Sequence, residues 1–261
     1  MDNLGFNPYL AFGWSVLAGF IMSMGAGGGG ILAGIGHISI LGIGDANMIK
    51  VVNQILEFVS RIFSVPLYHR QKRLVWPLAI SYAAGAPAGA VAGSWLSKNH
   101  LSDMNVYRPV FGLLVAAVAA RILYEVWWKP RRGRPRETGE TPGRMRGERT
   151  GEREAVEGSW RESAAPAVSW VSWRRVRVVF RGREFPFSTV LTAAGGFAIS
   201  FMGAMIGVGG GFLVTPFMAT VLLIPMYLVV GTALLALMIP LAASVLAYVA
   251  MQVQVNWILV A

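Results

Sequence analysis

Two runs of glycine, 182 residues apart, have the composition and spacing to bind a ligand. One run covers Gly25 to Gly30 and the other covers Gly207 to Gly211. A helix that restarts after such a run presents unpaired N–H groups and the positive end of its dipole, which together favour an anion. Glycine suits this task because a side chain would block the ligand and would disfavour positive φ angles. The predicted nest consists of Gly27, Gly28, Gly29, Gly30, Gly209, Gly210 and Gly211. The alternative is that these small residues only allow close helix packing.

A polar stripe on one predicted helix is the second candidate. Its members recur at intervals of three and four residues and therefore share one helix face; they are Lys50, Asn53, Gln54, Glu57 and Arg61. Charged residues inside a membrane are expensive and mark functional sites by default. Glu57 and Arg61 can neutralise each other, so we expect Lys50 to be the free cation that binds an anion, with Asn53 and Gln54 donating hydrogen bonds. Alternatively, Lys50 and Arg61 only extend to the two membrane surfaces.

Other chemistry finds little support in the sequence. The chain contains no cysteine, and its three histidines are far apart and lack metal-ligand spacing. His37 has the chemistry of a proton-coupling group. No Ser-His-Asp order or carboxylate pair suggests an enzyme, and the first glycine run lacks the strand that a dinucleotide fingerprint requires. We therefore expect no catalytic residues, no metal and no cofactor.

The composition indicates a membrane protein with one solvated segment. Of the 261 residues, 55% are hydrophobic and only 14% are charged, and residues 129–187 hold a large share of the charges. Stretches of about 20 apolar residues can cross the bilayer; they are 45–67, 74–97, 105–128 and 226–250, with two longer glycine-interrupted stretches at 9–42 and 188–224. The expected fold is an all-α, multi-pass helical protein with two broken helices.

The glycine runs also suggest an internal repeat. The offset of 182 aligns the two runs and the apolar segments after them, and it places Thr232 opposite Lys50. Duplicated units with matched broken helices are typical of transporters. The expected domains are a first repeat (1–128), the basic loop (129–187) and an incomplete second repeat (188–261). The missing helices are either truncated or supplied by a partner, for example in a homodimer. Parallel and inverted repeats remain open.

The basic segment predicts orientation and a lipid contact. The link around Arg70 to Arg73 and the long loop fall on the same side, which the distribution of Lys and Arg assigns to the cytoplasm. Residues 133–158 have the composition of a disordered segment. The following part interleaves Trp170, Trp173 and Phe180 with arginines, which is typical of a segment lying on anionic headgroups. We expect contact with the lipid bilayer and no nucleic-acid partner.

Together, the paired motifs Gly25-Ala26-Gly27-Gly28-Gly29 and Gly207-Val208-Gly209-Gly210-Gly211, the second followed by FLVTPFM, resemble the TauE/SafE family of sulfite exporters. The resemblance covers both hydrophobic blocks. It implies a permease that moves sulfite or a related inorganic or organosulfur anion across the bacterial inner membrane. The alternative function is a non-transporting sensor or assembly subunit whose basic loop docks a cytoplasmic partner or anionic lipid.

Overall fold

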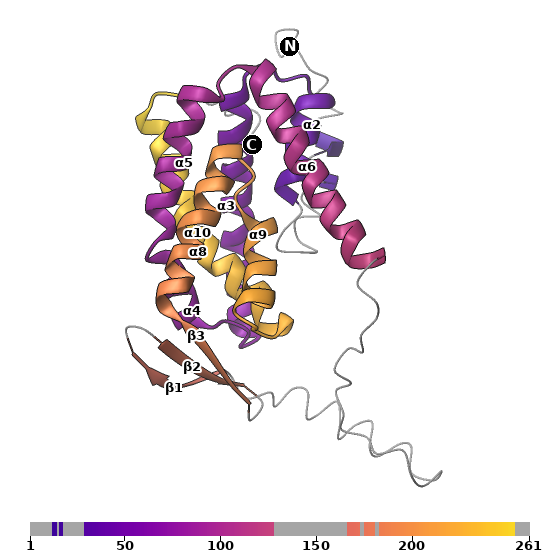
Figure 1. Ribbon diagram of the computed structural model, residues 1–261. Coiled ribbons are helices and arrows are strands. Elements are labelled where there is room, and N and C mark those ends of the chain that lie inside the picture. The colour runs from indigo at the N-terminus through magenta and orange to yellow at the C-terminus, as the bar shows by residue number, and fades with distance from the viewer. Residues whose placement is uncertain are drawn as a thin grey trace, which may run out of the picture. The chain divides into compact units, whose positions relative to one another are not determined.

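A computed structural model describes residues 12–14, 16–17, 29–127, 166–172, 175–180 and 183–253 (Figure 1). It divides into two units, one of Met1–Arg108 with Ala165–Ala261 and one of Pro109–Ala164. The described residues are mostly helical, as expected. The helices are α2 (Gly29–Ser39), α3 (Ala46–Arg70), α4 (Trp76–Ala83), α5 (Ala86–His100), α6 (Met104–Trp127), α8 (Thr189–Ile206), α9 (Gly211–Pro216), the π-helical turn η1 (Phe217–Val221) and α10 (Met226–Ala250).

Two of these helices are long and apolar enough to cross a membrane. They are α8, with 18 residues and a mean hydropathy of 1.7, and α10, with 25 residues and a mean hydropathy of 2.3. The 25-residue α3 is long enough but carries the polar stripe. The expected span 74–97 is divided into α4 and α5 by a turn at Ala84 and Gly85.

The second glycine run interrupts a helix, as the sequence predicts. Helix α8 ends at Ile206 and is capped by Gly207, which has a left-handed backbone with a φ of 78°. Gly209 and Gly210 also have positive φ angles, 68° and 74°, and α9 then begins at Gly211. A residue with a side chain would be strained at each of these three positive φ angles, so glycine is required at positions 207, 209 and 210. Of the first run, only Gly29 and Gly30 are described, at the start of α2.

A three-stranded sheet corrects the all-α expectation. The antiparallel order is β1 (Ala167–Val171), β2 (Arg175–Phe180) and β3 (Arg183–Ser188), at one end of the helices of the first unit (Figure 1). In β2, Val176, Val178 and Phe180 are buried and pack in one apolar core with residues of α4, α8 and α10. The arginines between them face outward, because successive strand residues point to opposite faces. Residues 129–165 of the basic loop lie outside the described residues.

Helices α5 and α8 approach each other closely through a row of small residues. A Cβ atom added to Gly85, Gly89 or Gly93 would collide with the carbonyl oxygen of Ala193, Phe197 or Phe201, respectively. Glycine at every fourth position therefore lets the backbone of one helix lie against the backbone of the other. This contact fixes α5 beside α8 and positions the residues of both helices that line the site described next.

Helices α3 and α10 have the same length and end in the same way. Each has 25 residues, followed by a turn in which the Arg73 and Val253 N–H groups donate 3.1 Å hydrogen bonds to the carbonyls of Tyr68 and Tyr248. These turns are 180 residues apart, so the offset of 182 does not extend through α10. When α3 and α10 are aligned with an offset of 180 residues, Val230, and not Thr232, corresponds to Lys50.

The two matched helices run in opposite directions. Near the start of α10, the Thr232 hydroxyl contacts the backbone of Val75, which follows the end of α3. At the other end, Lys98 of α5 contacts the carbonyl of Met251 after α10, while Leu101 contacts Lys50 near the start of α3. The start of each helix therefore lies at the same end of the bundle as the end of the other.

Candidate functional site

The described parts of both glycine segments meet at the polar stripe of α3. A Cβ atom on Gly30 would collide with Oε1 of Glu57 and would lie 2.8 Å from the Val208 carbonyl oxygen. A Cβ atom on Gly209 would collide with Oε2 of the same carboxylate. At the start of the same loop, a Cβ atom on Gly207 would lie 2.6 Å from the Lys50 Cα. The glycines are therefore needed for two backbone segments to close around one carboxylate.

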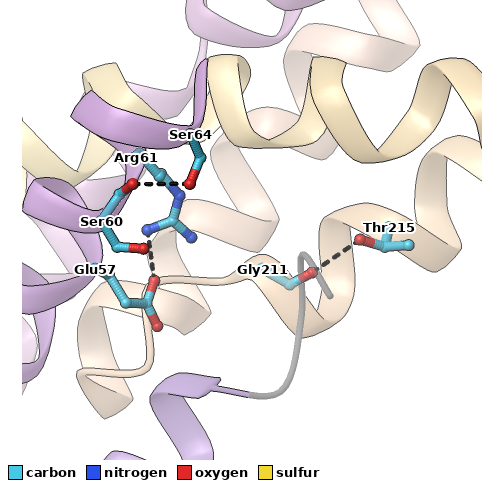
Figure 2. Close-up of polar contacts among 6 residues, drawn as sticks. All are labelled: Glu57, Ser60, Arg61, Ser64, Gly211 and Thr215. Atoms are coloured by element: carbon cyan, nitrogen blue, oxygen red, sulfur yellow. Dashed lines mark hydrogen bonds and ion pairs between the residues drawn. The ribbon is translucent and has the colours of Figure 1, made fainter. Parts of the chain in front are cut away.

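Glu57 and Arg61 form the ion pair expected from their spacing. Nη1 of Arg61 lies 2.8 Å from Oε2 of Glu57, and both side chains are buried, with 6% and 7% of their surfaces exposed. Figure 2 shows the guanidinium reaching back over one turn of α3 toward the carboxylate. A buried ion pair loses the hydration of both charges, so its geometry has to compensate for a large desolvation cost. Nε of Arg61 has no hydrogen-bond partner among the described residues.

The amide side chains of the stripe also carry unused hydrogen-bonding atoms. Asn53 is fully buried beside the His37 imidazole, and neither of its amide atoms makes a regular hydrogen bond within the described residues. Nε2 of Gln54 donates to the Ala204 carbonyl at 3.4 Å, but its Oε1 accepts no hydrogen bond there. Buried polar groups are normally satisfied. Their concentration around Glu57 therefore indicates a site that a polar ligand can occupy.

A small pocket opens beside this stripe, where α3, α5, α8 and α10 meet. It holds about 10 Å³, roughly the space of one water molecule. Its lining consists of Gln54, Ala90, Ser200, Ala204, Gly209, Pro240, Leu241 and Ser244. The pocket thus connects two residues that the sequence singled out, Gln54 and Gly209, to hydroxyl groups from two further helices.

Sequence reasoning missed the hydroxyl groups around this pocket. The Ser244 hydroxyl lies 2.6 Å from that of Ser94, and the Ser200 hydroxyl lies 3.3 Å from that of Tyr82. All four side chains are buried. Single serines in apolar helices usually bond to their own helix backbone, so these residues carry no signal in the sequence. Only the packing of four helices brings them together.

Neutral groups hold the side chain of Lys50, the residue that the sequence predicts to be a free cation. Its ammonium donates a 2.7 Å hydrogen bond to the Leu101 carbonyl and a 3.3 Å bond to Oδ1 of Asn47. It also lies 4.7 Å from the centre of the Tyr107 ring, a favourable cation–π distance. The side chain is buried and points toward the end of α5. The role of Lys50 as an anion ligand stays a prediction.

The remaining predicted residues are placed as follows. Gly29, Gly30 and Gly211 are buried at the starts of α2 and α9. Figure 2 shows the Thr215 hydroxyl donating to the Gly211 carbonyl oxygen at 3.3 Å, within the first turn of α9. A Cβ atom on Gly210 would approach Ile199 and Leu237, so this residue serves packing. Gly27 and Gly28 lie outside the described residues. Within the part of the chain that is described, no His, Asp and Glu side chains gather as a metal site would require.

Thr232 ties α10 to the turn before α4. Its hydroxyl accepts a 3.0 Å hydrogen bond from the Val75 N–H, and the side chain is fully buried. In Thr232→Val this amide would lose its partner, so we expect the free energy of unfolding to fall by about 1 to 3 kcal/mol. Thermal unfolding in detergent measures the change. Thr220→Val is the matched control, since its exposed hydroxyl bonds only to its own helix. Equal midpoints for the two variants would contradict the assignment.

The lengths and apolar composition of α8 and α10, together with a buried polar site in one helical bundle, are consistent with a helical membrane protein. Residues 11–261 match the model of the sulfite exporter TauE/SafE family, and the chain belongs to this family. The family is one of membrane transporters for sulfite and related anions. Comparisons with curated proteins and with solved structures gave no match.

Proposed function

We propose that the chain is a multi-pass permease that exports sulfite or a related small sulfur-containing anion across the bacterial inner membrane. The observation that carries this proposal is the convergence of both glycine segments on the ion pair of α3. The proposed binding site comprises Gly29, Gly30, Asn53, Gln54 and Gly209, with Gly210 and Gly211 shaping the second glycine turn. Gly27 and Gly28, outside the described residues, stay part of the predicted nest. Membrane transporters commonly bind their substrates where two broken helices meet.

The opposed directions of α3 and α10 support inverted repeats. The two helices share their length and their final turn, and they cross the bundle in opposite senses. Inverted repeats provide two similar half-structures that can exchange conformations, which exposes one central site alternately to the two sides of the membrane. The polar stripe occurs only in α3, so the path through the protein is chemically asymmetric.

The basic end of the bundle supports the proposed orientation. The Arg73 guanidinium lies 4.2 Å from the centre of the Tyr227 ring, and the Phe180 ring stacks on the same tyrosine at 5.7 Å. The link after α3 and the sheet therefore share one end of the first unit. Arg175 and Arg183 are exposed on this sheet. An excess of Lys and Arg marks the cytoplasmic side, so we place the sheet in the cytoplasm.

The proposed function is tested by sulfite flux into proteoliposomes that contain the purified chain. Saturable uptake that thiosulfate or another sulfur-containing anion inhibits would support the permease. Protein-free liposomes measure passive leakage. Flux equal to that leakage would contradict the proposal.

The two roles considered for Lys50 predict different results for Lys50→Ala. Because its ammonium is held by the Leu101 carbonyl, we expect the variant to lose about 1.5 kcal/mol of unfolding free energy, the lower range for a hydrogen bond to a charged group. The KM for sulfite should not change. Flux and thermal unfolding of the same preparation measure both quantities, with the exposed Lys72→Ala as the control. A raised KM with unchanged stability would instead support Lys50 as an anion ligand.

The exposed arginines of the sheet favour the docking protein as the second candidate. Arg177 and Glu184 form an exposed pair at 3.7 Å, beside Trp170. Such a basic and aromatic surface suits anionic lipid or an acidic partner. Replacing the exposed Arg175, Arg177 and Arg183 with glutamine separates the candidates, because a permease should keep its flux while a docking protein should lose its function.

A further inference from the structure

We propose that Arg61 is the cation that binds the transported anion, and that Glu57 releases this cation by taking up one proton. This inference rests on the proposed function and names the substrate class more closely: a monoanion that binds together with a proton. The observations that carry it are the enclosed position of the Glu57 carboxylate, its ion pair with Arg61 and the unused hydrogen-bonding atoms around both.

Glu57 occupies the place where an anion would bind. Its two carboxylate oxygens lie against Gly30 and Gly209, the backbone positions that the two glycine segments bring together. The carboxylate also takes the charge of Arg61, at 2.8 Å. For an anion that approaches this site, the cation Arg61 is already paired, and the negative charge of Glu57 repels it. The site therefore binds an anion only when Glu57 gives up its charge or its position.

Protonation of Glu57 allows an anion to bind without changing the net charge of the site. The carboxylate takes one proton from water and becomes a neutral carboxylic acid, and its ion pair with Arg61 is replaced by a pair between Arg61 and the anion. Before binding, the site holds one positive and one negative charge. After binding of a monoanion and a proton, it again holds one of each. A dianion would leave one buried negative charge uncompensated, which is strongly unfavourable.

The surroundings offer no second cation for a dianion among the described residues. From α2 and the glycine loop, the groups that face Glu57 are backbone at Gly30 and Gly209. From α10, Leu241 and Pro240 line the neighbouring pocket. Other titratable groups around the stripe are Tyr82 of α4, whose hydroxyl contacts Ser200, and His37 of α2, beside Asn53. Lys50 lies two turns away on α3 and is held by the Leu101 carbonyl. The site should thus prefer hydrogensulfite or an organic sulfonate over sulfate.

Anion binding to the purified chain tests the inference, with methanesulfonate as the probe because it remains a monoanion across the pH range used. As pH rises, fewer molecules carry the linked proton, so the affinity of the wild type should fall, by up to about tenfold per pH unit for one proton. Glu57→Gln should bind with an affinity that does not change with pH. Sulfate should compete at least tenfold less well than methanesulfonate in the wild type.

Matched variants separate this role from others. Glu184→Gln removes an exposed, paired carboxylate on the sheet and should keep the wild-type pH dependence. Arg61→Gln should lose at least tenfold in affinity, and Arg61→Lys should recover part of it. A pH dependence that survives in Glu57→Gln would overturn the proposal; its loss in His37→Gln would then assign the proton to His37.

Direct proton uptake keeps the test independent of any variant. Adding methanesulfonate to the weakly buffered wild type should remove about one proton from solution per anion bound. Binding without proton uptake overturns the inference, as does the failure of any monoanion to bind. Sulfite flux in proteoliposomes tests the permease function separately. Flux without proton uptake would support the permease function and contradict the role of Glu57. Proton-linked anion binding without flux would support the binding site and contradict the transport function.

Discussion

Gly209→Ala is expected to reduce sulfite flux at least tenfold. The new Cβ atom would collide with Oε2 of Glu57, and the φ of 68° adds about 1 to 2 kcal/mol of backbone strain for an L-residue. The Glu57 carboxylate must move or the glycine loop must shift, and either change disrupts the close approach of the loop to the ion pair. Uptake of sulfite per folded molecule in proteoliposomes measures the loss.

Gly42→Ala is the matched control for this variant. Gly42 has a similar φ of 63°, but a Cβ atom there meets nothing within 4 Å. Both variants therefore carry the backbone strain, and only Gly209→Ala obstructs the site. If both lose flux equally, strain alone explains the effect and the close approach to Glu57 is irrelevant. If Gly209→Ala transports normally, the glycine loop does not form part of the site.

The polar stripe of α3 was predictable because helical periodicity follows from the sequence alone. Residues three and four positions apart must share a face, and the ion pair between Glu57 and Arg61 follows from the same spacing. The partner of Lys50 was not predictable, because the Leu101 carbonyl lies 51 residues away and is contributed by the end of α5. Periodicity identifies which residues of one helix act together, but not which backbone groups of other helices satisfy them.

The sheet was predictable in principle, because the sequence carries the alternating pattern of a strand. The sequence of β2 alternates arginine with valine, and a period of two is typical of a half-buried strand. We expected a segment on lipid headgroups, because tryptophan and arginine dominate its composition. The buried Val176 and Val178 show that the alternation, and not the composition, determined the structure. The change of the repeat offset from 182 residues at the glycine runs to 180 at the ends of α3 and α10 is a different case. A gap of two residues in a connecting loop leaves no trace in an apolar sequence.

Gly89→Ala is expected to destabilise the bundle by up to about 3 kcal/mol, the upper range for overpacking a tight contact. The added methyl group would collide with the Phe197 carbonyl oxygen and lie 2.8 Å from its carbon. Backbone atoms cannot rotate away as a side chain can, so α5 and α8 must separate along their contact. The midpoint of thermal unfolding in one detergent measures the loss.

Gly112→Ala is the same chemical change, but we expect it to stabilise the protein. Gly112 lies within α6, and a Cβ atom there meets nothing within 4 Å. Replacing a helical glycine by alanine in open space reduces the entropy lost on folding, so this variant should gain about 0.5 to 1 kcal/mol. Opposite signs for the two variants would show that contact between backbones, and not helix propensity, places glycine in α5. Stabilisation of both variants would mean that the contact between α5 and α8 can accommodate an added methyl group. In that case the pocket, which includes Ala90 of α5 and Ser200 of α8, would not be held by this contact.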